Sequence, residues 1–196
     1  MIHELSNSIA CFYGDKANYT KDEIEICTYG LELIISDAIA IFIAIIIALF
    51  TKNVLYTIIL IASFASLRLQ AGGFHASSHL RCNLIFFAAY IMSLLIVKFT
   101  PIAITPYLVR ILSGLGLIAV CIYAPVAHPN KPVSKKKKKK YRFRSLVIVI
   151  IFCIIALILS LYPKISQYAV GIAMSIFYAG LSIVAERLKQ SKSVSQ

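Results

Sequence analysis

Six long apolar runs constrain the fold of this chain more than any other feature of its sequence. They cover approximately residues 31–50, 54–69, 83–99, 104–127, 146–162 and 165–185. A helix needs about 20 apolar residues to cross a hydrocarbon core of about 30 Å. With 60% hydrophobic residues, the composition is that of a membrane protein and not of a water-soluble domain. The sequence therefore predicts an all-α, polytopic integral membrane protein with about six transmembrane or re-entrant helices, forming a single domain over residues 1–196.

The second and third runs, 54–69 and 83–99, are shorter than the first, fourth and sixth. They flank a polar stretch that contains Gly72-Gly73. Irregular backbone is tolerated at membrane depth only where protein or a wet cavity covers it. Two short runs around a glycine pair therefore predict a segment that dips into the membrane and is shielded by neighbouring helices.

The first 30 residues are predicted to lie at the cytoplasmic face as an interfacial segment. They contain acids and no long apolar run, so they do not resemble a secretory signal peptide. Apolar residues recur at helical spacing, namely Ile2, Leu5, Ile9 and Phe12. This pattern predicts an amphipathic helix over residues 2–13 on the membrane surface. Thr20 followed by Glu23 matches a capping box, which predicts the start of the next helix.

The distribution of charge predicts the orientation in the membrane. Residues 1–37 hold seven of the eight acids, whereas residues 38–185 contain no acid and 15 lysines or arginines. Many of these cations lie in one predicted connection, residues 128–145. The positive-inside rule places that loop in the cytoplasm. Counting the spans from there puts both termini and residues 70–82 on the cytoplasmic side as well.

The stretch RLQAGGFHASSHLRC, residues 68–82, is the main candidate for a functional site. Polar and ionisable groups at membrane depth are costly and are seldom kept without a use. The five cysteines are odd in number and irregularly spaced, which disfavours a disulfide framework. Only Cys82 has both basic groups and histidines nearby in sequence. Such surroundings lower the pKa of a thiol and produce a reactive thiolate.

Three interpretations of this stretch remain open from the residue types. Cys82 can be a nucleophile with His75 or His79 as its base. The stretch can instead be a polar turn that contacts lipid headgroups, or a metal site, because both histidines and Cys82 share one face of a continuous helix. On such a helix His75 and Cys82 are about 10 Å apart along the axis, so His79 is the nearer base. Gly72 and Gly73 can supply a turn ahead of His75.

Several of these residues resemble the core motif of the AgrB family of accessory gene regulator proteins, which are membrane-embedded cysteine peptidases of Gram-positive bacteria. The matching residues are Arg68, Gly72-Gly73, His75-Ala76 and Cys82, together with Tyr29-Gly30-Leu31-Glu32-Leu33, Tyr123-Ala124-Pro125 and Asn130-Lys131-Pro132 before a basic run. Where some relatives carry an acid after the Ala-Pro, this chain has Val126-Ala127-His128. We therefore assign that loop no catalytic role.

The resemblance implies a function and roles for individual residues. The family processes a short precursor peptide, AgrD, into a cyclic autoinducer for quorum sensing. By this match His75 is the catalytic base and Cys82 the nucleophile, while Arg68, Gly72 and Gly73 belong to the accompanying motif. His79 has no role that the match carries over. The resemblance also implies a homodimer in the bacterial plasma membrane. No cofactor or metal is expected, because exchange of one thioester for another needs no ATP.

Weaker candidates surround this core. Glu32 is expected to orient His75 or to line the substrate entrance, and Asp37 and Gln70 are further polar candidates. Arg68 or Arg81 can stabilise an oxyanion or extend to headgroups. The lysine run consists of Lys135, Lys136, Lys137, Lys138, Lys139 and Lys140. It either sets topology and binds anionic lipid, at about 1 kcal/mol per lysine, or docks an acidic precursor tail.

Two other classes of function fit the residues less well. The lysine run is not expected to bind nucleic acid, because no folded reading element accompanies it. The main rival is a small membrane transporter or metal permease that uses a helix face with His75, His79 and Cys82. Transporters typically show inverted halves or polar residues in several spans, whereas charge within the apolar runs is sparse here.

Overall fold

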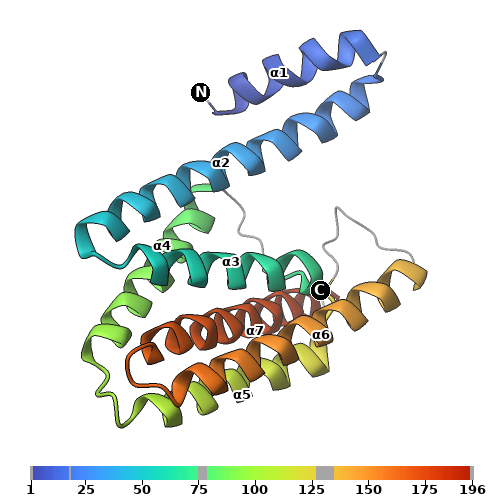
Figure 1. Cartoon of the computed structure of the whole chain (residues 1–196). Coiled ribbons are helices and arrows are strands. Elements are labelled where there is room, and N and C mark those ends of the chain that lie inside the picture. The colour runs from blue at the N-terminus through green and yellow to red at the C-terminus, as the bar shows by residue number, and fades with distance from the viewer. Residues whose placement is uncertain (1, 18, 75–78, 127–134, 195–196) are drawn as a thin grey trace.

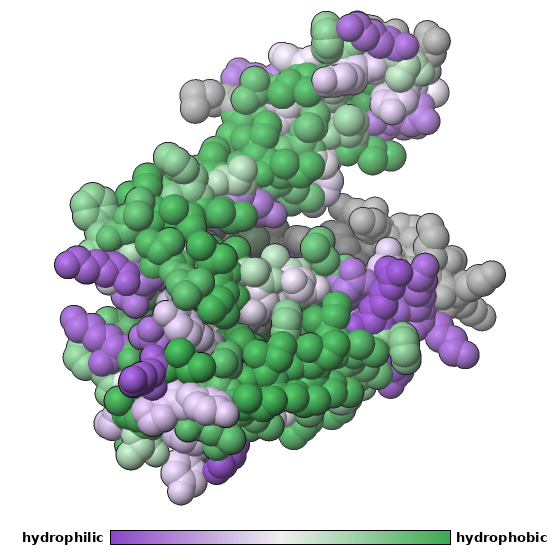
Figure 2. Space-filling model, in the orientation of Figure 1, coloured by the Kyte–Doolittle hydropathy of each residue, from purple (hydrophilic) through white to green (hydrophobic). Residues whose placement is uncertain are grey.

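The computed structural model describes residues 2–17, 19–74, 79–126 and 135–194, and this part of the chain forms seven α-helices (Figure 1). Their bounds are α1 Ile2–Ala17, α2 Lys21–Thr51, α3 Val54–Ala71, α4 His79–Phe99, α5 Thr105–Tyr123, α6 Lys135–Ser160 and α7 Ser166–Val194. Among the described residues, six helices are long and apolar enough to cross a membrane. Hydrophobic residues form a band across the helical bundle, and hydrophilic residues gather near the helix ends (Figure 2). The predicted all-α architecture is confirmed.

The first two helices form a hairpin, of which α1 and the amino-terminal part of α2 project from the rest of the molecule, whereas the carboxyl-terminal part of α2 packs against α3 and α4 (Figure 1). The predicted capping box is present, because the Thr20 N–H donates to the Glu23 carboxylate at 2.8 Å and the Glu23 N–H donates to the Thr20 hydroxyl at 3.4 Å. α1 covers more residues than the predicted 2–13. It buries Ser6 and Ala10. The large apolar residues Leu5 and Phe12 remain exposed, as expected for a helix that contacts lipid.

The prediction of a short third span is wrong. α4 begins at His79 and has 21 residues, so Cys82 lies in the first turn of a helix and not in a connection. α3 has 18 residues, which corresponds to about 27 Å. Only Gly72–Phe74 of the connection between these helices is described, and this part is not helical. The predicted dip into the membrane falls largely on residues 75–78, outside the described residues.

The sixth membrane-crossing helix, α7, lies at the centre of the bundle and packs against α3, α5 and α6. The contact between α5 and α7 is close because small residues face each other there. A Cβ atom on Gly116 would lie 2.5 Å from the Ile176 carbonyl oxygen, and one on Gly180 would lie 3.0 Å from the Gly116 Cα. Small residues allow this close backbone approach in membrane helices, where van der Waals packing is a main source of association.

Side-chain hydroxyl groups connect α3, α4 and α7 in the buried interior. The hydrogen bonds run from Tyr56 to the Ser93 carbonyl at 3.2 Å, between Thr57 and Tyr90 at 2.8 Å, from Tyr178 to the Ala89 carbonyl at 3.0 Å, and from Ser175 to the Leu60 carbonyl at 2.7 Å. Interhelical hydrogen bonds of this kind stabilise membrane bundles by about 0.6–2 kcal/mol each. They hold α3, α4 and α7 around the pocket described below.

Candidate active site

The glycine pair after α3 forms a turn that other residues would not fit. α3 ends at Ala71, and the backbone then has φ +76° at Gly72 and φ +147° at Gly73. A Cβ atom on Gly72 would lie 2.2 Å from the Val126 carbonyl oxygen, and one on Gly73 would lie 2.3 Å from the Ser182 Oγ. Glycine is needed at both positions, because its positive φ costs little and it has no side chain to clash.

Backbone hydrogen bonds hold this turn on two sides. The Val126 N–H donates to the Ala71 carbonyl at 3.0 Å, next to an isolated bridge between Val126 and Gly72. On the other side, the Phe74 N–H donates to the backbone carbonyl of Ser182 in α7 at 3.0 Å. The turn is thus attached both to the chain that follows α5 and to the centre of the bundle. Its position determines where the chain leaves toward His75.

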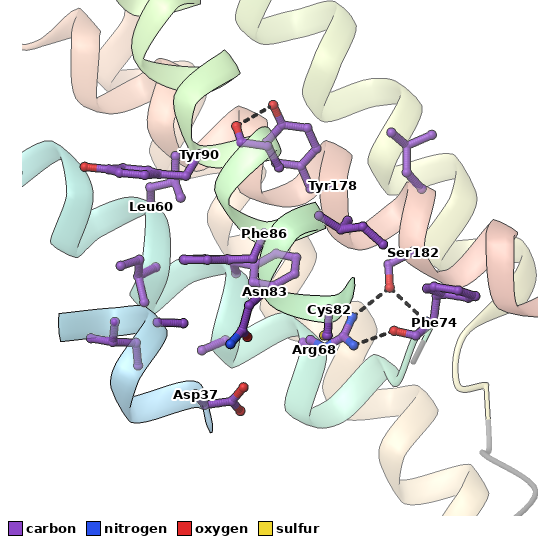
Figure 3. Close-up of a pocket in the computed structure, with 18 of the residues that line it drawn as sticks. Asp37, Leu60, Arg68, Phe74, Cys82, Asn83, Phe86, Tyr90, Tyr178 and Ser182 are labelled. Carbon is purple, nitrogen blue, oxygen red and sulfur yellow. Dashed lines mark hydrogen bonds between the residues drawn. The ribbon is translucent and has the colours of Figure 1, made fainter. Parts of the chain in front are cut away.

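The Arg68 side chain braces the same turn from within. Its Nη1 donates to the Ser182 Oγ at 2.8 Å, and its Nη2 donates to the Phe74 carbonyl at 2.5 Å (Figure 3). Cys82 and Asp37 line the same pocket as the guanidinium, and Figure 3 shows Cys82 beside it. Arg68 therefore does not extend to lipid headgroups. It holds the turn in place and puts a positive charge near the sulfur of Cys82.

Cys82 lies at the polar end of a pocket of about 550 Å³ between α2, α3, α4 and α7. Its thiol is free and half-buried. Asp37, Arg68, Asn83 and Ser182 line the same pocket, and Figure 3 places Arg68, Cys82 and Ser182 close together. The rest of the lining is apolar or aromatic. Three lining residues, Ile41, Ile85 and Leu181, are exposed, so the pocket is open and not an enclosed cavity.

A family model, Accessory gene regulator B, matches residues 6–183. The chain belongs to the AgrB family. It is 34% identical over 112 residues to the accessory gene regulator protein B of Staphylococcus aureus strain bovine RF122 / ET3-1, and 32% identical over 112 residues to that of strain JH9. Each of these matches covers 55% of this chain and 56% of the relative, so the chain spans about half the length of these curated relatives. No solved structure matches the chain.

The AgrB resemblance inferred from the motifs is thereby confirmed, and the protein is a multi-pass membrane protein of this family. The structure brings four of the predicted motif residues together: Arg68, Gly72 and Gly73 in and around the turn, and Cys82 at the pocket beside it. His75 lies outside the described residues. Its role as the base of this AgrB-family protein stays a prediction.

A continuous helix through residues 68–82 is contradicted, because Gly72–Phe74 interrupt it. His79 is the first residue of α4, and its side chain lies outside the described part of the structure. The metal interpretation needs His75, His79 and Cys82 on one face. Among the described side chains, no group of three or more His, Cys, Asp or Glu residues is placed to hold a metal ion. His75 is not among these described side chains.

Glu32 lies at the contact between the first two helices of this AgrB-family protein. Its carboxylate accepts a hydrogen bond from the His3 Nδ1 of α1 at 2.5 Å. Only 14% of the Glu32 side chain is exposed, compared with 75% of His3. This interaction attaches α1 to α2. The predicted action of Glu32 on His75 stays untested.

The prediction that the lysine run lies in a loop before a span at 146–162 is wrong. α6 begins at Lys135, so Lys135–Lys140 form the first turns of this helix. Lysine is a good helix former, and the apolar residues that follow continue the same helix. Lys138, Lys139 and Lys140 are exposed.

Three polar residues around the site were missed by sequence reasoning. Ser182 binds the turn although more than 100 residues separate the two in sequence, and a single serine in an apolar run carries no signal. Asn83 donates to the Ser36 hydroxyl at 3.1 Å, which connects α4 to α2. Glu186 is 1% exposed, and its Oε2 has no hydrogen-bond partner among the described residues. Glu186 is the single acidic residue after Asp37 in the sequence. An isolated acid at the end of an apolar run could have identified it as a candidate.

Proposed function

We propose that this AgrB-family protein is a membrane-embedded cysteine endopeptidase. It removes the C-terminal tail of a short AgrD-like precursor peptide and closes the remaining peptide into a thiolactone or lactone autoinducer. The observation that supports this proposal best is the position of Cys82. Its thiol lies at the polar end of an apolar pocket, beside the positive charge of Arg68. A cysteine in this position can meet a peptide carbonyl away from bulk water.

The first step is acyl transfer to the enzyme. The Cys82 Sγ attacks the carbonyl carbon that precedes the precursor's tail, and His75 accepts the thiol proton. The C–N bond then breaks, His75 gives the proton to the leaving amine, and the tail departs with a free N-terminus. The acyl group remains on Cys82 as a thioester. Arg68 places positive charge where negative charge develops on the sulfur and on the tetrahedral intermediate.

The second step closes the ring. A cysteine thiol or serine hydroxyl within the precursor attacks the thioester carbonyl and loses its proton to His75. The C–S bond to Cys82 breaks, and the proton returns to its sulfur. A thioester is exchanged for a thioester or an ester, so the step needs no ATP. The apolar pocket keeps water from hydrolysing the intermediate before the ring closes.

The orientation of the site is part of the proposal. The amino end of α6, which carries the lysine run, lies at the same end of the bundle as the carboxyl ends of α3 and α7 (Figure 1). By the positive-inside rule this end is cytoplasmic, with both termini and the active site on that side. We propose a location in the bacterial plasma membrane, contacts of the lysine run with anionic lipids, and a homodimer.

Replacing the nucleophile tests the function directly. Cys82→Ala and Cys82→Ser should abolish release of the tail from an AgrD-like precursor produced in the same cells, with membrane insertion unchanged. In the wild type, mass spectrometry should find the acyl adduct on Cys82. Cys121→Ala is a matched control, because Cys121 is a free and exposed thiol on α5. Persistent cleavage by Cys82→Ala would contradict the mechanism.

A further inference from the structure

The part of the pocket distant from Cys82 is apolar although two tyrosines border it. The Tyr178 hydroxyl donates to the Ala89 carbonyl at 3.0 Å, and the Tyr90 hydroxyl donates to the Ala44 carbonyl at 3.2 Å. Both hydroxyl groups are thus used within the protein. The apolar lining includes Phe64 and Leu181, together with Leu60, Phe86 and Tyr178, which Figure 3 shows around the pocket.

The polar side chains of the lining lie toward the other end, where Cys82 and the opposite charges of Asp37 and Arg68 are found (Figure 3). The volume of about 550 Å³ lies within the range of about 300–1,000 Å³ that is usual for ligand pockets. A few polar groups beside a large apolar surface are typical of a pocket that orients a ligand by one end. The ligand should therefore combine an apolar group with a polar group that reaches Cys82.

We infer that this pocket binds a large apolar side chain of the substrate residue whose carbonyl is attacked by Cys82. This inference rests on the proposed peptidase function and adds a specificity to it. The pocket thus selects peptides in which a large aliphatic or aromatic residue precedes the cleaved bond.

Two arguments assign the pocket to this residue and not to the departing tail. A charged segment would lose its hydration in an apolar pocket without gaining partners, which is costly. The acyl part, in contrast, stays attached to Cys82 until the ring closes. Apolar contacts on that side hold the intermediate after the tail has left and exclude water from the thioester.

Peptidyl chloromethyl ketones test the inference without knowledge of the natural precursor. Such a reagent alkylates a thiol: the new C–S bond replaces C–Cl, chloride leaves, and the thiol proton goes to a base. The probes are two ketones that differ only in the residue next to the ketone, phenylalanine or alanine. The purified protein in liposomes is treated with each, and the rate of Cys82 modification is followed by mass spectrometry. Iodoacetamide measures the side-chain-independent reactivity of Cys82 in each variant.

In the wild type we expect the phenylalanine ketone to react at least about tenfold faster than the alanine ketone, as is typical of apolar specificity pockets. Ala89→Leu fills the pocket and should bring this ratio close to one. Ala88→Leu is the matched control, because Ala88 is adjacent on α4, exposed, and outside the lining. Ala65→Leu in the lining and Ala62→Leu outside it repeat the comparison on α3, should one variant fail to fold.

Equal rates for the two ketones in the wild type would overturn the inference, and a pocket filled by a lipid chain would give that result. An unchanged ratio in both Ala89→Leu and Ala65→Leu would overturn it as well. Neither result would affect the proposed peptidase function, which is tested separately by the dependence of precursor cleavage on Cys82. Cleavage without Cys82 would instead refute that function, whatever the ketone ratio.

Discussion

Ser182 is the residue through which the bundle core holds the turn, and its removal should reduce activity more than stability. Ser182→Ala removes the 2.8 Å hydrogen bond from Arg68 and the 2.9 Å bond from the Phe74 N–H to the hydroxyl. The Phe74 N–H keeps the Ser182 carbonyl at 3.0 Å, so the main loss is the bond from the charged Arg68. Such a bond contributes about 1.5–3 kcal/mol. If the whole of this free energy is lost from the transition state, activity falls about 10- to 160-fold.

The control lies on the same helix. Ser175 is buried, and the single proton of its hydroxyl is shared between the Leu60 carbonyl at 2.7 Å and the Gly171 carbonyl at 2.9 Å, away from the turn. Ser175→Ala should lower the thermal midpoint of the helical circular dichroism signal but leave the rate of Cys82 thioester formation near that of the wild type. Ser182→Thr retains the hydroxyl and should recover much of the rate lost in Ser182→Ala. Equal rate losses in both alanine variants, or a wild-type rate in Ser182→Ala, would refute the reasoning.

Three further variants test other parts of the site. Gly73→Ala should reduce precursor cleavage more than tenfold, because positive φ costs about 1–3 kcal/mol and the new Cβ would lie 2.3 Å from the Ser182 Oγ; Gly114→Ala, with no atom within 4 Å, should be active. His75→Ala should lose nearly all cleavage, whereas His79→Ala should lose little. The reverse result would show that His79 and not His75 is the base. Replacing Lys135–Lys140 with glutamine should add its loss to that from neutralising the precursor's acids, since we expect these lysines to set topology; a non-additive result would indicate tail docking.

Features that depend on neighbouring residues were predictable from the sequence. Apolar runs identify membrane helices because backbone groups in lipid must bond within their own segment. The capping box at Thr20 and Glu23 needs only a four-residue pattern. The turn at Gly72-Gly73 was similarly indicated by residue type. The starts of α4 and α6 were misplaced for one reason: polar residues can continue a helix beyond the apolar run that identifies it.

Contacts between distant segments were not predictable. Glu32 is a candidate because of its place in the family motif. Its described partner is His3, which lies 29 residues earlier in the sequence, on α1. The partnership of Arg68 with Ser182 depends on α7 crossing beside α3, which no local pattern encodes. Cys82 was predicted from its polar surroundings. The apolar pocket beside it is formed by four packed helices, and no local sequence pattern encodes their packing.

The exposed residues at the edge of the pocket affect how such an enzyme must be measured. Ile41, Ile85 and Leu181 line the pocket and are exposed, so the pocket is open beside apolar residues, and under the proposed function we expect the peptide to reach Cys82 by lateral diffusion within the bilayer. The relevant concentration is then the number of peptides per area of membrane and not per volume of solution. Adding inert lipid at constant amounts of enzyme and peptide should slow the reaction. Kinetic constants for this protein therefore require the lipid-to-peptide ratio as a stated variable.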